Sequence, residues 1–174
     1  MPKPHQRGDG FIKCGNDDVV TWCVGHLLEQ AEPDAYDPKF KQWRLEHLPI
    51  IPEKWILLPR KEVKKQLSVV EKLIHQADVL VNAGDPDREG QLLVDEVLYF
   101  VGNTKPVQRI LLNALDEKSV KSALGDLRDN KDFYNLYQSA LARARADWLI
   151  GMNLSRAYTL SERYKGNKVT LPIG

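Results

Sequence analysis

A short apolar run that ends in a turn with three acidic residues constrains this chain more than any other stretch. Val79, Leu80 and Val81 have the length and the β-branched content of a buried strand. After the turn, apolar residues recur at helical spacing, at positions 92, 93, 94, 97 and 98. The turn itself reads Gly84-Asp85-Pro86-Asp87-Arg88-Glu89-Gly90. The sequence therefore predicts a strand, an acidic turn and a helix in direct succession.

The three acids of this turn, Asp85, Asp87 and Glu89, allow two interpretations. In the first, Asp85 caps the helix, Pro86 occupies its first position, and the other two acids complement the positive end of the helix dipole. In the second, the three carboxylates form a site for Mg²⁺, which prefers a few carboxylates together with water and phosphate oxygens. Capping needs only one acid, so the number of carboxylates favours the metal site.

The composition describes a soluble chain with enough apolar material for a core. Its 174 residues fit one domain with at most a second subdomain, and 43% of them are hydrophobic, with a mean hydropathy of -0.42. No apolar run approaches membrane-spanning length and no signal-peptide region is found, so we expect a cytoplasmic protein without a membrane partner. Cys14 and Cys23 are predicted to be buried, reduced thiols, and a disulfide is the less favoured alternative.

Helices alternate with apolar strands along the first two thirds of the chain. The predicted elements are a hairpin over 11–24, a helix over 61–75, a strand over 107–112, and a helix from its N-cap Asp116 to about Leu127. Residues 31–59 contain several prolines and little periodicity, which predicts a loop-rich insertion. The alternation indicates an α/β sheet with parallel neighbours, in which ligands bind at the carboxyl ends of strands, where Asp85 falls.

From about Phe133 the composition changes to an alanine-rich segment that predicts a helix over 139–158. Between residues 140 and 168 there are four more cations than anions. Arg143 and Asp147 are spaced to pair on the helix surface. The cations left unpaired, Arg145, Arg156 and Arg163, fit a surface that contacts phosphates without reading base sequence.

Two side chains outside this helix each allow a structural and a nucleic-acid interpretation. Trp43, which stands between Lys41 and Arg44, either packs inside the protein or stacks on a base. His26 either contacts a phosphate or is a hydrogen-bonded structural histidine, and the structural role is favoured.

Four segments, taken together, resemble a known family. Residues 83–90, Ala83-Gly84-Asp85-Pro86-Asp87-Arg88-Glu89-Gly90, resemble the signature of Toprim domains, the Mg²⁺-binding module of topoisomerases and bacterial primases. Residues 20–27, 42–55 and 142–153 resemble segments of type IA topoisomerases, most closely the bacterial topoisomerase III group. The resemblance extends over essentially the whole chain, with the four segments in the family's order.

The resemblance implies a fold, a cofactor and a set of site residues. It implies a Toprim domain, a Rossmann-like α/β sheet with flanking helices, over residues 1–130, including the insertion at 31–59. The beginning of an all-helical DNA-binding domain would follow over residues 131–174. Asp85, Asp87 and Glu89 would hold Mg²⁺. The residues implied to contact single-stranded DNA are Trp43, Arg109, Arg143, Asp147, Trp148, Arg156 and Arg163.

The resemblance also implies an activity that this chain lacks the means to perform alone. Type IA topoisomerases cleave, pass and reseal single DNA strands through a 5′-phosphotyrosine intermediate. The family's first strand, with its glutamate and lysine, and the segment with the nucleophilic tyrosine find no match here. We therefore expect a fragment without catalytic residues of its own, inactive alone, with single-stranded DNA as partner and no small-molecule substrate. The parent enzyme would be cytoplasmic and associated with the nucleoid.

The unmatched first strand implies an exposed edge of the sheet. That strand should neighbour residues 79–81, so without it we expect an exposed sheet edge that favours self-association.

Two alternative functions stay open. The first alternative function is a self-standing, non-catalytic Toprim-type module that binds nucleic acid. The second is a phosphotransfer protein that uses one aspartate of the turn as nucleophile. The arginine-rich helix weighs against this second alternative.

Overall fold

The structure is a computed structural model that describes residues 3–173, which form two compact units. Unit 1 contains the described residues up to Glu29 and the segment Pro59–Ala140. Unit 2 contains Gln30–Leu58 and the described residues from Leu141 onward. The compact units thus group the loop-rich segment with the basic helix, whereas the sequence analysis placed that segment in the first domain. The predicted domain boundary near residue 130 stays a prediction.

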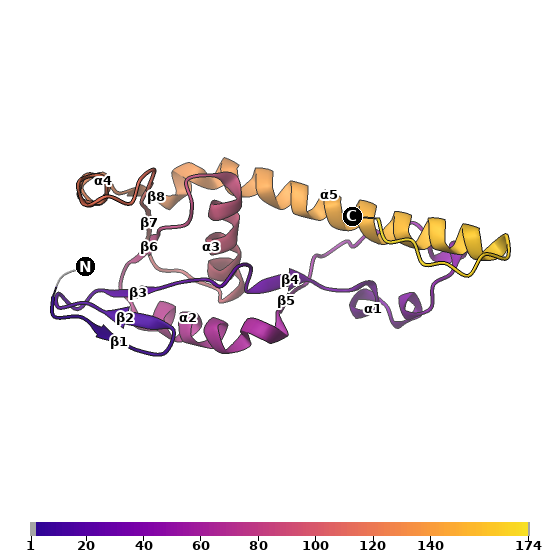
Figure 1. Ribbon diagram of the computed structural model, residues 1–174, viewed down its shortest axis with the longest axis horizontal. Coiled ribbons are helices and arrows are strands. Elements are labelled where there is room, and N and C mark those ends of the chain that lie inside the picture. Colours follow the sequence, from indigo (N-terminus) through magenta and orange to yellow (C-terminus); the bar gives the residue numbers. More distant parts are fainter. Residues whose placement is uncertain (1–2, 174) are drawn as a thin grey trace. The chain divides into compact units, whose positions relative to one another are not determined.

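Unit 1 begins with a small antiparallel sheet, drawn in indigo in Figure 1. Its strands β1 (Gln6–Arg7), β2 (Phe11–Lys13) and β3 (Val19–Thr21) pair in that order, and Phe11 lies opposite Thr21. The predicted hairpin is therefore confirmed, with shorter strands than expected.

Helix α2 (Lys64–Gln76) follows a single 3₁₀ turn, Lys61–Val63, and confirms the predicted helix over 61–75. Its buried side chains, Leu67, Val70 and Ile74, recur at the helical spacing found in the sequence. At its C-terminal end, Lys105 Nζ donates to the carbonyls of Ile74 and His75 at 3.0 and 2.6 Å. These bonds satisfy carbonyl groups that have no partner within the helix.

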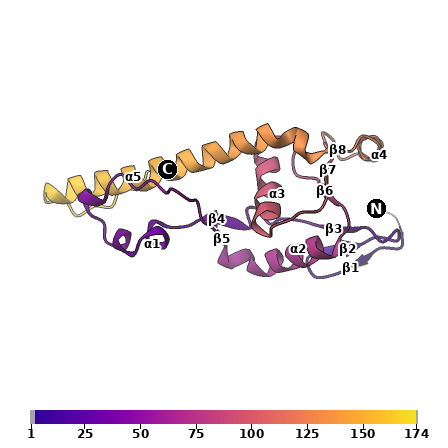
Figure 2. The ribbon, with the colours of Figure 1, turned by 180° about the vertical axis from the view of Figure 1, so that it is seen from behind.

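The second sheet of unit 1 positions the acidic turn. Strands β6 (Leu80–Asn82) and β7 (Val107–Arg109) are parallel, and β8 (Arg128–Asp129) adds antiparallel to β7. Helix α3 (Arg88–Phe100) lies in the connection from β6 to β7 (Figures 1 and 2). The predicted α/β architecture with parallel neighbours is therefore confirmed. Strand β8 was not predicted, because two polar residues give no strand pattern.

Strand β6 lies at an edge of this sheet. Within residues 3–173, β7 is its only strand neighbour. Val79 and Val81 are 50% and 48% exposed, so the run predicted as a buried strand has one face open. This edge agrees with the exposed strand that the sequence analysis expected. Self-association of the chain stays a prediction.

Helix α4 (Glu117–Leu124) confirms the predicted N-cap at Asp116, whose side chain accepts from Ser119 N at 3.0 Å. The helix ends three residues earlier than predicted, and Gly125 follows as its C-cap. A 3₁₀ turn, Asn130–Phe133, leads into the last helix.

Unit 2 combines a loop-rich segment with most of a long helix. Strand β4 (Leu28–Gln30) pairs with β5 (Leu57–Pro59) at the points where the chain passes between the units. The segment between these strands contains only α1 (Pro33–Tyr36) and two 3₁₀ turns, Pro38–Lys41 and Leu45–His47, as the prolines predicted.

Helix α5 (Tyr134–Tyr164) is longer at both ends than the predicted helix over 139–158. In unit 2, Asn153 of α5 forms a paired hydrogen bond with the backbone of Ile50. Its Oδ1 accepts from Ile50 N at 2.6 Å, and its Nδ2 donates to Ile50 O at 2.9 Å. Among the helices that the structure describes, none is long and apolar enough to cross a membrane.

The two cysteines are free thiols, as predicted. Cys14 is buried and Cys23 is half-buried. Burial, with a smaller contribution from the Glu96 carboxylate, raises the pKa of Cys23 to about 11. The thiol of Cys23 is therefore protonated and carries no charge at neutral pH.

Candidate functional site

The acidic turn is held at both ends by side chains that bond to the backbone. At the end of β6, Asn82 Oδ1 accepts from Gly84 N at 3.0 Å. At the start of α3, Asp87 Oδ1 accepts from Gly90 N at 2.7 Å, which makes Asp87 the N-cap. The interpretation with Asp85 as the cap is therefore wrong. Its backbone is held by a different contact, described below, and the helix begins only at Arg88.

The two glycines of the turn, Gly84 and Gly90, are packed so closely against backbone atoms of the turn that neither position has room for a side chain. A Cβ atom on Gly90 would collide with the backbone of Asp85, and one on Gly84 would collide with the carbonyl oxygen of Gly90. The loop thus closes onto the first turn of the helix, backbone against backbone.

Replacing Gly90 by alanine is expected to lower the free energy of unfolding by about 1–3 kcal/mol, the usual cost of overpacking. Alanine would otherwise favour a helical position by about 1 kcal/mol. The collision with Asp85 outweighs this gain because backbone atoms cannot rotate away. Urea unfolding measures the difference. Gly125→Ala is the matched control, since its Cβ would meet Ser122 O at an ordinary 3.4 Å. Equal stabilities for Gly90→Ala and the wild type would contradict the closed turn.

Arg109, at the end of β7, holds the acidic turn in place through hydrogen bonds to its backbone. Its side chain is 1% exposed. Nη1 donates to the carbonyls of Asn82 and Gly84 at 3.1 and 2.7 Å, and Nη2 donates to the carbonyl of Asp85 at 2.6 Å. Burial lowers the pKa of Arg109, while the carboxylates Asp95, Asp87 and Asp85 oppose that shift. The buried guanidinium thereby fixes the backbone of the loop that carries the acids.

A buried polar network lies next to this clamp, and the sequence analysis did not find it. Gln91 Nε2 donates to Asp95 Oδ2 and to Asn130 Oδ1 at 2.8 and 2.9 Å. Asn82 Nδ2 and Asn130 Nδ2 both donate to Asp95 Oδ1, at 3.3 and 2.9 Å. The spacing of Gln91 and Asp95, one turn apart on the buried side of α3, was a signal that could have revealed it.

The three predicted metal ligands are all exposed on the turn. Glu89 lies 3.5 Å from Arg88 Nε, and one oxygen of Asp87 is occupied by the cap. Within residues 3–173, no three His, Cys, Asp or Glu side chains are placed as a group that could hold a metal ion. Mg²⁺ requires only one or two carboxylates when water and phosphate complete its shell, and hard oxygen donors are present. The metal assignment of Asp85, Asp87 and Glu89 stays a prediction.

Trp148, which was predicted to contact DNA, lies in the core of unit 2. It is 8% exposed, and its Nε1 donates to Ala31 O at 3.1 Å. Its ring meets Tyr36 and Trp55 edge-on, with centroids 5.8 and 5.4 Å apart. Arg145 lies over Trp55 at 5.2 Å, a contact that the sequence analysis did not find.

Arg156 and Trp43 form a second aromatic contact within unit 2. The guanidinium of Arg156 lies 5.1 Å from the ring centre of Trp43, and its Nη1 donates to Phe40 O at 2.8 Å. Burial lowers the pKa of Arg156, and the carboxylates of Glu32 and Asp34 oppose that shift. Trp43 is half-buried, so it packs on Arg156 and keeps part of its surface open.

The remaining predicted DNA contacts lie on the surface of α5. Arg143 Nε lies 3.6 Å from Asp147 Oδ2, which confirms the predicted pair. Both side chains are more than half exposed. Arg163 is exposed and donates to Val169 O and Thr170 Oγ1 at 3.3 and 3.1 Å. Direct contact of any of these residues with DNA stays a prediction.

Similarity to known proteins extends over the whole chain. Residues 8–115 match the sequence pattern of the Toprim domain family. The chain is 68% identical over 178 aligned residues to the DNA topoisomerase 3 of Haemophilus influenzae and 66% identical to that of Pasteurella multocida. It is 40% identical over 159 residues to the DNA topoisomerase 3 of Bacillus subtilis. The first two alignments cover 100% of this chain and 27% of the relative, and the third covers 90% and 22%. The chain thus spans about a quarter of the length of these curated relatives.

Proposed function

Because the chain belongs to the Toprim domain family, we propose that it is the part of a type IA DNA topoisomerase that holds Mg²⁺ and contacts single-stranded DNA. The similarity to proteins named DNA topoisomerase 3 along the whole chain supports this proposal. The observation that carries it is the acidic turn, which presents three exposed carboxylates on a backbone fixed by the buried Arg109. A rigid backbone under flexible carboxylates is suited to positioning a phosphate group.

In this proposal the residues of the turn hold the cation and those of unit 2 hold the nucleic acid. Asp85, Asp87 and Glu89 supply oxygen ligands, and Mg²⁺, when bound, supplies positive charge beside a phosphodiester. The DNA-contacting side chains are Trp43, Arg143, Asp147 and Arg163. Asp147 orients Arg143 through their ion pair.

Three residues implied to contact DNA act in this proposal by positioning others. Arg109, Trp148 and Arg156 are buried, and each donates a hydrogen bond to a backbone carbonyl of its own unit. Arg109 holds the acidic turn, Trp148 the core of unit 2, and Arg156 the ring of Trp43.

The full enzyme would cleave, pass and reseal single DNA strands through a 5′-phosphotyrosine. We place its nucleophilic tyrosine and one further glutamate outside this chain, so the chain alone would not relax supercoiled DNA. We place the enzyme in the cytoplasm with the nucleoid, without a membrane or small-molecule partner.

The first test is a calorimetric titration with Mg²⁺ of the wild type and of the double variant Asp85→Asn, Asp87→Asn. Asparagine caps helices as well as aspartate, so the variant loses two charges and keeps the N-cap of α3. We expect the double variant to bind Mg²⁺ on the order of tenfold more weakly or worse. Asp116→Asn changes the equivalent cap of α4 and should bind Mg²⁺ like the wild type.

The same proteins are then tested for DNA binding and for activity. A labelled single-stranded oligonucleotide should bind with an affinity that falls steeply as salt rises. The chain should leave supercoiled plasmid unchanged in the presence of Mg²⁺. Relaxation of the plasmid, or no binding of the oligonucleotide, would contradict the proposal. Binding of the oligonucleotide with unaltered Mg²⁺ affinity in the double variant would instead favour a non-catalytic nucleic-acid module.

A further inference from the structure

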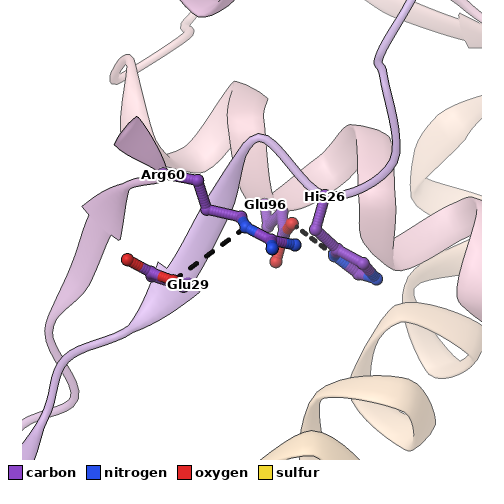
Figure 3. A network of polar contacts seen from close by, with 4 residues as sticks. All are labelled: His26, Glu29, Arg60 and Glu96. Atoms are coloured by element: carbon purple, nitrogen blue, oxygen red, sulfur yellow. Dashed lines mark hydrogen bonds and ion pairs between the residues drawn. The ribbon is translucent and has the colours of Figure 1, made fainter. Parts of the chain in front are cut away.

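His26 is fixed to a buried carboxylate in unit 1, at a distance of 70 residues along the chain. Its Nδ1 lies 2.8 Å from Glu96 Oε1. A dashed line marks this contact in Figure 3. Because a carboxylate only accepts hydrogen bonds, Nδ1 carries the hydrogen in this pair. The Glu96 side chain is 8% exposed, on the inner face of α3, whereas that of His26 is 42% exposed. The structural role expected for His26 is thus present, but it occupies only one of the two ring nitrogens.

The second ring nitrogen, Nε2, is at the far end of the ring from Glu96. Among the hydrogen bonds of the described residues, none involves Nε2. A histidine held at Nδ1 by a carboxylate has a fixed ring orientation. When the ring is protonated, its Nε2–H can donate a hydrogen bond to a ligand. The His26 side chain is 42% exposed, so part of the ring is open to a ligand.

The titratable groups around His26 come from three segments. Glu96 and, more weakly, Glu89 of α3 raise the pKa of His26, while burial and Arg60 lower it, and the net pKa lies above the ordinary 6.5. Cys23, from the segment after β3, adds no charge because its thiol is protonated. His26 is therefore a cation over a wider pH range than an ordinary histidine.

A second cation lies on the same surface. Arg60 N donates to Leu27 O at 3.0 Å, which places Arg60 beside the segment that carries His26 (Figure 3). Its side chain is 45% exposed, and its only ion pair among residues 3–173 is a long one, 3.9 Å from Arg60 Nε to Glu29 Oε2. A guanidinium that is so loosely paired is available for a further anion.

We infer that His26 and Arg60 form a binding site for one phosphodiester group of single-stranded DNA, with Glu96 holding the imidazole so that Nε2–H faces the phosphate. Imidazolium and guanidinium donors both form charge-assisted hydrogen bonds to phosphate oxygens. Such a contact would set the position of the strand without reading its bases. The inference rests on the proposed binding of single-stranded DNA and adds a site to it in unit 1, apart from the residues considered above.

The test measures oligothymidylate binding by fluorescence anisotropy between pH 6 and 8.5, without Mg²⁺, so that the acidic turn carries no cation. The protonated form binds phosphate, so the affinity of the wild type should fall about fivefold as pH rises through the raised pKa of His26. His26→Gln should bind at the wild type's high-pH level throughout. Arg60→Gln should weaken binding at every pH and keep the pH dependence. His75→Gln, an exposed histidine whose side chain makes no ion pair among the described residues, should behave like the wild type.

A second measurement separates binding from folding. In NMR titrations of the imidazole signals, oligothymidylate should raise the pKa of His26 further and leave the positions of the His75 signals unchanged at a fixed pH. A shift of the same size with inorganic phosphate at equal concentration would assign the site to free phosphate and overturn the inference for DNA. His26→Gln with the wild-type pH profile would overturn it as well. If the wild type binds no oligothymidylate at any pH, the proposed function fails together with this inference. If it binds and His26 does not respond, only the inference fails.

Discussion

Replacing Arg109 by methionine is expected to lower the free energy of unfolding by about 3–5 kcal/mol, the range for losing one partner of a buried charged contact. Methionine fills much of the volume but donates no hydrogen bond. The carbonyls of Gly84 and Asp85 would then lose the donor that satisfies them, whereas the Asn82 carbonyl would keep Ile110 N at 3.0 Å. Each buried carbonyl left without a partner costs about 1–3 kcal/mol. Urea unfolding followed by circular dichroism measures the loss.

The strand register provides a matched control for this substitution. Arg128 of β8 lies directly opposite Arg109, but its side chain is about half exposed and pairs with Asp126 at 2.8 Å. Arg128→Met should change stability by no more than about 0.5 kcal/mol. The role of Arg109 as a clamp would be contradicted if Arg109→Met were as stable as Arg128→Met. A loss of DNA affinity at unchanged stability would instead indicate direct contact with DNA.

Trp148→Ala is expected to destabilise unit 2 by about 3–5 kcal/mol, as for other buried tryptophans. The substitution removes the edge-on contacts with Tyr36 and Trp55 and the hydrogen bond to Ala31 O. Trp148→Phe should keep most of the packing and lose only the hydrogen bond, about 1 kcal/mol. Near-ultraviolet circular dichroism during urea unfolding follows the aromatic cluster directly.

The alternative role for Trp148, stacking on a base, gives a different pattern. An exposed stacking residue would lose affinity for single-stranded DNA on truncation to alanine without losing stability. Phenylalanine would then restore much of the affinity. Trp22→Ala, at a tryptophan that is 36% exposed, serves as a control for the loss of an indole from the surface. A Trp148→Ala protein with wild-type stability would rule out the core role.

The elements that could be predicted from the sequence are those specified by residues close together in the chain. The spacing of Leu67, Val70 and Ile74 predicts α2 because about two turns of one helix contain the whole signal. Asp116 is identified as a cap because its partner, Ser119 N, is three residues away. The hairpin between β2 and β3 is likewise encoded by a short glycine-containing link.

The features that could not be predicted depend on partners far along the chain. Local chemistry pointed to Asp85 as the cap, but Arg109, more than twenty residues later, binds the Asp85 carbonyl, and the cap is Asp87. The resemblance to type IA topoisomerases implied that Trp148 contacts DNA. Trp148 is instead buried and donates to Ala31 O. This burial could not be predicted from the local sequence, because Ala31 lies 117 residues away. The residues of the acidic turn were found from sequence, and the groups that hold it in place were not.

The alternation of the two units along the chain has a consequence for the timing of folding. Unit 2 joins residues 30–58 to α5 through contacts such as Trp148 with Ala31, Arg156 with Phe40 and Asn153 with Ile50, each spanning more than 100 residues. At ribosomal rates of about 5–20 residues per second, residues 30–58 would wait roughly 5–20 s for these partners. Throughout that interval the side chains of Trp43 and Trp55 lack the arginines that later cover them. The nascent chain is therefore most exposed to aggregation, and most in need of a chaperone, shortly before α5 leaves the ribosome.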